Sequence, residues 1–364
     1  MRVLGISSYP VTAAATRFRM EQFVGPLAER GIELTISPFL DAEQFGRLYS
    51  TGGVIGKSLG VIGPLMHRVS ETFRLGRYDL LFVQREAMPF GPGVFEWLFQ
   101  KAGRLPMVLD LDDATYIRYV SPSFGRVGSY LKFFGKTDKL IERAATVVCG
   151  NRYIAEYVEA KGTPAVVVPT VVDTDKFCPV ERRNDIPVLG WIGTHSTYPF
   201  LEWLAPVFAR LAEKHQFRVK VVGAGKAVFE GDGYEVVGLD WELDREIADF
   251  QSLDIGLYPL KETASFDVNW LRGKSGFKAI QYMAVGVPFI TTPIGVTGEI
   301  GEVGKTHLNA TTLDDWYNQL DKLLADAELR REMGAAGRRF SLDNYTVARQ
   351  VPILAEALTN AAHP

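Results

Sequence analysis

Short apolar runs alternate with longer amphipathic segments along the whole chain. Runs such as Leu80–Gln84, Met107–Leu111 and Thr146–Cys149 have the length and the Val and Leu content of buried strands. We predict further strands at residues 3–6, 33–37, 165–168, 188–192, 218–222, 234–237, 254–258 and, as the last strand, 289–291. Strands that alternate with helices are typical of parallel sheets covered by helices. The fold class predicted is therefore α/β.

Helical spacing occupies the segments between these runs. A helix is expected from Arg17 to about Arg30, where Gly31 ends it, and another over residues 277–285, where Gly286 ends it. From residue 313 to about 361 the pattern is helical, with Gly334 and Gly337 expected to interrupt it.

The polar stretch CPVERRNDI at 178–186 divides two such strand–helix series and is interpreted as a linker. We therefore expect a Rossmann-like, doubly wound domain at 1–177, a second at 187–345, and a C-terminal helix at 346–364 that packs back on the first domain. Ligands bind outside the carboxyl ends of the strands in such sheets. We accordingly expect two doubly wound domains that face a central cleft.

Composition narrows the class of protein. The chain has 364 residues, 47% hydrophobic and 23% charged, with a net charge of −3, which gives no indication of nucleic-acid binding. Two cysteines are too few for a disulfide framework or a zinc cage, and no apolar run reaches the roughly 18 residues that cross a bilayer. We expect a cytoplasmic protein.

A candidate anion site precedes the helix at 277–285. The first turn of a helix directs backbone N–H groups outward, and its dipole attracts anions. Ser275, Gly276 and Phe277 would supply such groups, and Lys274 and Lys278 add positive charge beside them. Two lysines at a helix start are locally unfavourable without an anion. A phosphate-binding role is therefore preferred for Lys278, whereas for Lys274 both a phosphate contact and a solvated lysine stay open.

The same stretch carries a family resemblance. Residues 281–288, QYMAVGVP, resemble the donor-site signature of the retaining nucleotide-sugar glycosyltransferases of family 4, in which a Glu, seven residues and a second Glu open a Glu-Ala-Met-Ala-x-Gly-x-Pro run. Gln281 stands at the place of the second Glu, Tyr282 at that of the first Ala, and Gly273 at that of the first Glu. Lys278 stands where some branches of the family carry a lysine.

The resemblance implies the GT-B fold of two facing Rossmann-like domains, with the acceptor side on the first domain and the donor side on the second. It implies transfer of a sugar from a nucleoside diphosphate sugar to an acceptor glycan, a lipid-linked intermediate or a small molecule, with retention of configuration and without metal or cofactor. Lys278 and the helix N-terminus would stabilise the leaving diphosphate.

Further donor contacts are expected around this helix. Gly193, Thr194 and His195 follow the strand at 188–192, which places them near the expected phosphate, although a lone histidine is often structural. A carboxamide both donates and accepts hydrogen bonds, so Gln281 would hold the ribose hydroxyls, with a purely structural role as the alternative.

In the first domain, Asp112 and Asp113 lie with Asp110 at the carboxyl end of a predicted strand, and resemble an acidic motif in a branch of the family. An acceptor-orienting or base role is preferred for one of them to a magnesium site, with helix capping as the alternative. Arg17 and Arg19 are expected to contact the donor diphosphate or the acceptor.

A basic and aromatic stretch lies between residues 114 and 139. A surface helix with packed aromatics is the preferred explanation, and the functional alternative is an acceptor-side patch or a peripheral contact with the inner face of the membrane. Its basic and aromatic members are Arg118, Arg126, Lys132, Lys136, Lys139, Tyr116, Tyr119, Phe124, Tyr130, Phe133 and Phe134.

Two other functions stay open at this level. Nucleotide-sugar epimerases and sugar phosphorylases share the GT-B fold, and Gly273 with Gln281 is also compatible with a degenerate, non-catalytic binding subunit.

Overall fold

The computed structural model describes residues 1–49, 61–118, 130–181, 184–225 and 227–363. The chain forms two compact units, the first made of Met1–Thr170 with Val347–Pro364 and the second of Val171–Thr346. The segment at 171–186 thus belongs to the second unit. There, Arg338 donates hydrogen bonds to the carbonyl oxygens of Thr174 at 2.9 Å and Phe177 at 2.7 Å.

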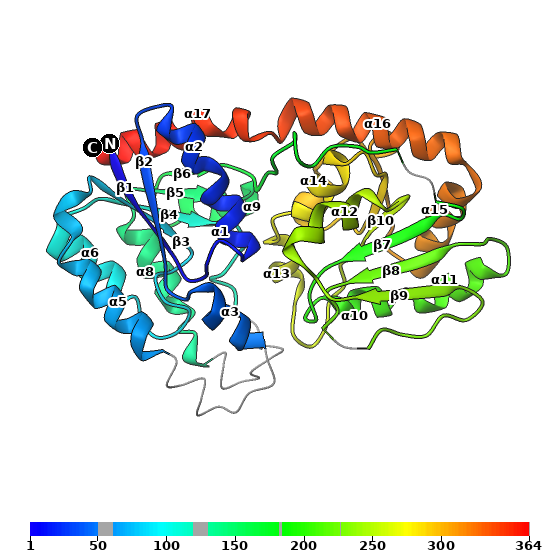
Figure 1. Cartoon of the computed structure of the whole chain (residues 1–364), viewed down its shortest axis with the longest axis horizontal. Coiled ribbons are helices and arrows are strands. Elements are labelled where there is room, and N and C mark those ends of the chain that lie inside the picture. The colour runs from blue at the N-terminus through cyan, green and yellow to red at the C-terminus, as the bar shows by residue number, and fades with distance from the viewer. Residues whose placement is uncertain (50–60, 119–129, 182–183, 226, 364) are drawn as a thin grey trace. The chain divides into compact units, whose positions relative to one another are not determined.

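Unit 1 is built on a six-stranded parallel sheet with the order β2-β1-β3-β4-β5-β6 (Figure 1). Its interior strands are apolar on both faces because helices cover both sides of such sheets. The strands are β1 (Arg2–Ser7), β2 (Glu33–Pro38), β3 (Leu80–Gln84), β4 (Met107–Leu111), β5 (Thr146–Cys149) and β6 (Ala165–Val167). Among the helices are α3 (Ala42–Tyr49), α5 (Ile62–Thr72), η2 (Leu75–Arg77), α6 (Val94–Gly103), α8 (Gly135–Arg143) and α9 (Arg152–Glu159).

The single helix expected from residue 17 to 30 is wrong. The segment forms α1 (Ala14–Arg19), a 3-10 turn η1 (Glu21–Phe23) and α2 (Val24–Ala28). Pro26 has no N–H to donate to the carbonyl of Gln22, so a continuous helix loses a hydrogen bond there.

Unit 2 has a second six-stranded parallel sheet, with the order β12-β11-β10-β7-β8-β9. Its strands are β7 (Val188–Ile192), β8 (Arg218–Val222), β9 (Glu235–Leu239), β10 (Ile255–Tyr258), β11 (Phe289–Thr291) and β12 (His307–Asn309). The prediction that 289–291 is the last strand is therefore wrong. β12 has only three residues, two of them polar, and carries no apolar run that would predict a strand.

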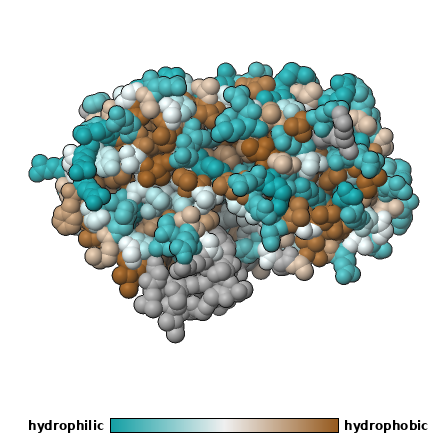
Figure 2. Space-filling view, viewed as in Figure 1, coloured by the Kyte–Doolittle hydropathy of each residue, from teal (hydrophilic) through white to brown (hydrophobic). Residues whose placement is uncertain are grey.

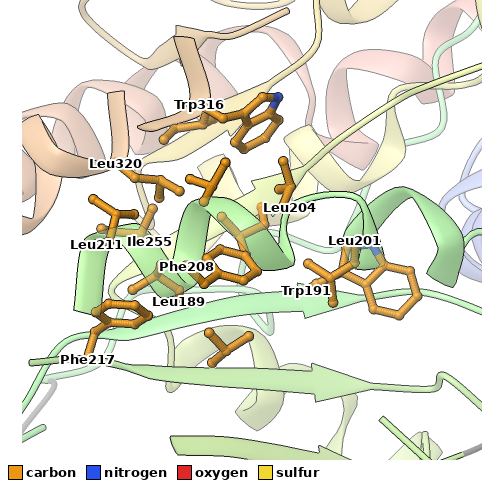
Figure 3. Packing of buried hydrophobic residues seen from close by; sticks show 14 of the residues in the cluster. Leu189, Trp191, Leu201, Leu204, Phe208, Leu211, Phe217, Ile255, Trp316 and Leu320 are labelled. Atoms are coloured by element: carbon orange, nitrogen blue, oxygen red, sulfur yellow. The ribbon is translucent and has the colours of Figure 1, made fainter. Parts of the chain in front are cut away.

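The core of unit 2 lies between this sheet and the helices α11 (Ala205–Ala212) and α15 (Leu313–Ala325) (Figure 3). Leu204, Phe208 and Leu211 pack over Leu189 of β7, and Trp316 of α15 closes the same cluster; all five are buried.

Two glycines expected to interrupt the C-terminal helices do not. Gly334 and Gly337 lie inside α16 (Ala327–Asn344), and the chain instead breaks at Asp326 and at residues 345–346. A Cβ at Gly334 would lie 2.3 Å from the carbonyl oxygen of Gly286, so glycine is required for close packing of α16 on the end of α14 (Phe277–Ala284).

The last helix, α17 (Val347–Ala362), packs against β3, β4, β5 and α2 of unit 1. None of the helices in the described ranges is long and apolar enough to cross a membrane.

Candidate functional site

The start of α14 has the features of an anion site. Its N-cap is Gly276 in the left-handed conformation, with φ of 66°, and no side chain caps the helix. A Cβ at this position would lie 2.7 Å from a methyl group of Val296. Glycine is thus required here both by the backbone conformation and by the approach of the neighbouring loop.

Lys278 is the second residue of α14, and its ammonium lies 5.5 Å from the ring centroid of Tyr258. Because Tyr258 is the last residue of β10, this contact brings Lys278 to the carboxyl edge of the sheet. Lys274 instead extends over Trp270, 4.5 Å from its ring centroid. The sequence pattern did not single out Tyr258, although its position at the carboxyl end of a predicted strand is one where ligands bind in such sheets.

Gln281 and Tyr282 lie one turn further along α14, and both are buried. Tyr282 is anchored: its hydroxyl lies 3.1 Å from the carbonyl oxygens of Gly190 in β7 and Leu257 in β10, and burial raises the pKa of its phenol. Gln281 as a whole residue is only 3% exposed, and its carboxamide makes no hydrogen bond within the described ranges. A glutamine this deeply buried without a protein partner for its amide is unusual and is compatible with a ligand partner.

The turns after β7 and β8 touch each other. Gly193 donates to the carbonyl of Val222 at 3.0 Å, and a Cβ at Gly223 would lie 2.3 Å from the carbonyl oxygen of Gly193. The side chain of His195 is next to Gly225, where an added Cβ would be 3.2 Å away. These glycines let the two turns approach the same point.

The hydroxyls of the β7 turn are occupied locally. The Oγ1 atom of Thr194 lies 2.8 Å from the Oγ atom of Ser196, and the Thr197 hydroxyl donates to the Thr194 carbonyl at 3.2 Å. Thr197 is the N-cap residue of α10 (Tyr198–Glu202) but makes no side-chain cap to it. The backbone N–H of Thr197 also donates to the Thr194 carbonyl, at 2.9 Å, so the turn is ordered by contacts among its own residues.

The strand order locates these groups in the sheet. β7 opens unit 2, β8 and β9 follow on one side of it, and β10, β11 and β12 lie on the other. The order reverses between β7 and β10, which is the place where open α/β sheets bind ligands at their carboxyl edge. The structure brings Gly193, His195, Gly225 and Lys278 to this edge. Gly273, the C-cap of α13 (Val268–Arg272), is a glycine and so adds no side chain there.

In unit 1 the arginine at position 19 lies in the interior. Arg19 is 2% exposed, makes a bidentate ion pair with buried Asp110, and donates to the carbonyl of Val168 at 2.6 Å. These partners favour a structural role over the ligand contact suggested by the sequence. Arg17 is half-buried and donates to the carbonyl of Thr12 at 3.0 Å.

Asp112 and Asp113 are held by Arg85. The guanidinium contacts both oxygens of Asp112, at 2.5 and 2.6 Å, and one oxygen of Asp113 at 3.2 Å. Burial by itself would lower the pKa of Arg85, but the two carboxylates raise it above its ordinary value. Arg85 has a left-handed backbone, with φ of 60°, a strained conformation for a non-glycine residue that is frequent at functional sites. Next to it, the Oε1 atom of Gln84 is buried without a partner in the described part of the chain.

The expected patch at 114–139 is described only in part, because Tyr119, Phe124 and Arg126 lie outside the described residues. Lys136 does not belong to a surface patch: it is buried and pairs with Glu86 at 2.8 Å, since the loop after β3 supplies a carboxylate beneath it. Tyr116 stacks on Tyr157 with ring centroids 3.7 Å apart. Arg118, Tyr130, Phe133 and Lys139 are exposed.

Comparison with known protein families gives a match to part of the chain. Residues 186–326 match the model of the family described as glycosyl transferases group 1. No curated protein matches the sequence.

Three solved structures are similar over nearly the whole chain. A glycosyltransferase from Rickettsia africae has a TM-score of 0.67 at 12% identity, and the match covers 100% of this chain and 98% of that chain. Sucrose-phosphate synthase from Thermosynechococcus elongatus has a TM-score of 0.66 at 13% identity, covering 99% of each chain. HepE from Anabaena, solved in complex with UDP, has a TM-score of 0.62 at 13% identity, and the match covers 99% of this chain and 100% of that chain.

Two parallel six-stranded sheets, a likeness to these structures over the full chain and the match of the second unit lead to one conclusion. The chain is a glycosyltransferase of the GT-B fold, and its residues 186–326 match the family described as glycosyl transferases group 1.

Proposed function

We propose that this glycosyltransferase takes a nucleoside diphosphate sugar as its donor and binds the diphosphate at the start of α14. The observation that carries the proposal is the uncapped N-terminus of α14, with Lys278 directed to the carboxyl edge of the sheet at its switch point. Backbone N–H groups, the helix dipole and an ammonium group then act on one anion. The complex of HepE with UDP is in line with such a donor.

The same groups would serve the chemical step. When the bond from the sugar to the diphosphate breaks, negative charge grows on the leaving phosphate oxygens. Fixed donors at that position stabilise the transition state more than the ground state. Lys278 and the turn at Gly193–His195 are the groups we assign to this task, with retention of configuration at the sugar carbon.

Gln281 would bind the ribose. Its buried carboxamide lacks a protein partner in the described ranges and lies one helical turn from Lys278. A side chain that donates and accepts at once suits a pair of ribose hydroxyls.

For the acceptor we assign Asp113 the role of base or orienting group. Both oxygens of Asp112 contact Arg85 and its side chain is 8% exposed, whereas the side chain of Asp113 is 23% exposed. The more accessible carboxylate is the better candidate to receive a proton from an acceptor hydroxyl.

The test combines binding with turnover. UDP, GDP, ADP and their sugars are screened for a rise in melting temperature, which a ligand bound only by the folded protein must cause. Lys278→Ala should weaken binding of the active nucleotide by roughly 10- to 150-fold, because a charge-assisted hydrogen bond to phosphate is worth about 1.5–3 kcal/mol.

Lys322→Ala is the matched control, since Lys322 is an exposed lysine on α15 of the same unit. Equal affinity in the Lys278→Ala and Lys322→Ala variants would remove Lys278 from the site. Conversion of a labelled donor without any acceptor would indicate an epimerase, and binding without any conversion a non-catalytic subunit.

A further inference from the structure

Helix α5 of unit 1 buries a charged side and exposes an apolar side, the reverse of an ordinary surface helix. Its inward face carries charge: Arg68 is fully buried and Glu71 nearly so, and they pair at 2.8 Å. The Arg68 guanidinium also donates to the carbonyl oxygens of Ser7 at 2.8 Å, Ser37 at 3.0 Å and Ala87 at 3.1 Å. Because a buried guanidinium is costly without these acceptors, the network fixes the rotation of α5 about its axis.

The outward face of α5 is apolar as a consequence. Ile62, Met66, Val69 and Phe73 are spaced by four, three and four residues, which places them on one side of a helix. All four are exposed, Met66 to 63% and Phe73, the C-cap residue, to 86%. A soluble helix normally buries such a stripe.

The apolar surface continues beyond α5. Val94 and Trp97 on the outer side of α6 are exposed, as are Tyr130, Leu131 and Phe133. α5 and α6 pack on each other, and Gly91, just before α6, donates to the carbonyl of Leu131 at 2.9 Å (Figure 1). Of the fifteen large apolar side chains that are exposed in the described ranges, these three segments hold nine. Figure 2 shows hydrophobic side chains at the surface at its lower left, over α5. We call the nine residues the apolar face.

The charges around the apolar face are mostly positive. On α5, η2, α6 and the two residues that follow each of them, the exposed charged or titratable side chains are His67, Arg74, Arg77, Lys101 and Arg104, with one acid, Asp79, which pairs with Arg2. The acidic residues of these helices, Glu71 and Glu96, are both buried. The surroundings of the apolar face are therefore complementary to an anionic partner.

We propose that the apolar face is a docking surface for an anionic lipid bilayer. Aromatic and aliphatic side chains would enter the boundary between headgroups and acyl chains, and Arg74, Arg77 and Lys101 would contact the anionic headgroups. A second copy of this chain fits less well, because it would bring like charges together around the same apolar face.

The experiment is flotation of the full-length protein with vesicles. Vesicles of equal parts phosphatidylglycerol and phosphatidylcholine should carry the protein upward at low salt, and vesicles of phosphatidylcholine alone should carry little. The double variant Met66→Ser, Phe73→Ser should lower the partition coefficient at least about tenfold, through lost apolar burial. The triple variant Arg74→Gln, Arg77→Gln, Lys101→Gln should lower it about fivefold per residue removed, with a weaker dependence on salt.

A matched control removes exposed apolar side chains from unit 2, as Val303→Ser with Leu342→Ser, and should leave flotation unchanged. All the substituted side chains are exposed, so melting temperatures should match that of the wild type. Absence of flotation at low salt would overturn the proposal, and so would an equal loss in the control variant. Self-association that the Met66→Ser, Phe73→Ser variant abolishes, without vesicle binding, would identify the face as an interface between copies.

Discussion

At the residue scale, Tyr282 shows how a large side chain occupies a place where the resembled family has alanine. A Cβ at Gly256 of β10 would lie 2.7 Å from atoms of the Tyr282 ring, so the glycine supplies the space that the ring fills. The hydroxyl then bonds to carbonyl oxygens on β7 and β10. The pair fixes α14 on the sheet, and with it the rotation that determines where Lys278 and Gln281 are directed.

Gln281 gives the first prediction at this scale. Gln281→Ala should lower donor affinity by up to about tenfold, the value of one neutral hydrogen bond of about 0.5–1.5 kcal/mol. The free energy of unfolding without ligand should change little through hydrogen bonding, because no described group is left unpaired. Titration calorimetry and thermal melting measure the two effects.

Gln281→Glu sharpens the test, since a carboxylate accepts from both ribose hydroxyls and should keep or improve donor binding. Gln350→Ala, at another buried polar position, on α17, is the control and should leave donor affinity unchanged. A Glu variant with a lowered melting temperature, together with an Ala variant of normal donor affinity, would contradict the ribose assignment.

His307 gives a prediction about pH. The ring is buried in β12 and stacks on Phe289, and burial lowers its pKa from 6.5 to about 4. Between these values the unfolded chain binds a proton that the folded protein does not, so the free energy of unfolding falls as the pH drops through this window. The full loss is about 3 kcal/mol.

Urea unfolding of unit 2 at a series of pH values measures this loss. His307→Gln removes the titrating ring and should flatten the profile between pH 6.5 and 4, whereas His67→Gln, at an exposed position, should not. An unchanged profile in the His307→Gln variant would show that other groups cause the acid sensitivity.

At the element scale, α14 and α16 meet backbone to backbone. Gly286 ends α14 in the left-handed conformation, with φ of 66°, and its carbonyl faces Gly334 in α16. Arg338, one turn further along α16, donates to the carbonyl of Ala284 at 2.7 Å. α16 thereby supports the helix that carries the proposed donor contacts.

Gly334→Ala tests this contact. The new methyl group would lie 2.3 Å from a backbone oxygen, so the helices must separate, and we expect a loss of about 1–3 kcal/mol in the free energy of unfolding. Gly63→Ala is the control, because it lies in α5 with no atom within 4 Å of the added Cβ. That substitution should be neutral or stabilising by up to about 1 kcal/mol. Equal effects of the two substitutions would contradict the close-packing argument.

At the scale of the whole molecule, the chain leaves unit 1 after Thr170 and returns to it at Val347. α17 then covers β3, β4 and β5 with buried Val351, Leu354 and Leu358. Unit 1 is therefore completed by a segment that follows unit 2 in the sequence.

Leu358→Ala should for this reason lower the stability of unit 1 by about 2–5 kcal/mol, the usual cost of removing a fully buried leucine, and leave unit 2 unchanged. Ile353→Ala on the same helix removes a side chain that is 38% exposed and should change stability by about 0.5 kcal/mol or less. Scanning calorimetry with limited proteolysis assigns each transition to its unit. A variant Leu358→Ala that melts like Ile353→Ala would show that α17 does not stabilise unit 1.

The sequence by itself determined the fold class and most of the strands. β3, β4, β5, β7, β8 and β11 begin and end where their apolar runs do, because burial on both faces of a parallel sheet leaves a continuous local signal. The start of α14 was equally predictable, since its glycines and lysines are adjacent in the chain.

The contact partners of charged side chains could not be predicted, because they come from remote segments of the chain. Only the tertiary structure placed Arg19 on Asp110, Lys136 on Glu86 and Arg68 under α5, and so decided that α5 presents its apolar side outward. Periodicity gives the two faces of a helix, but the acceptors available in the fold decide which face is buried.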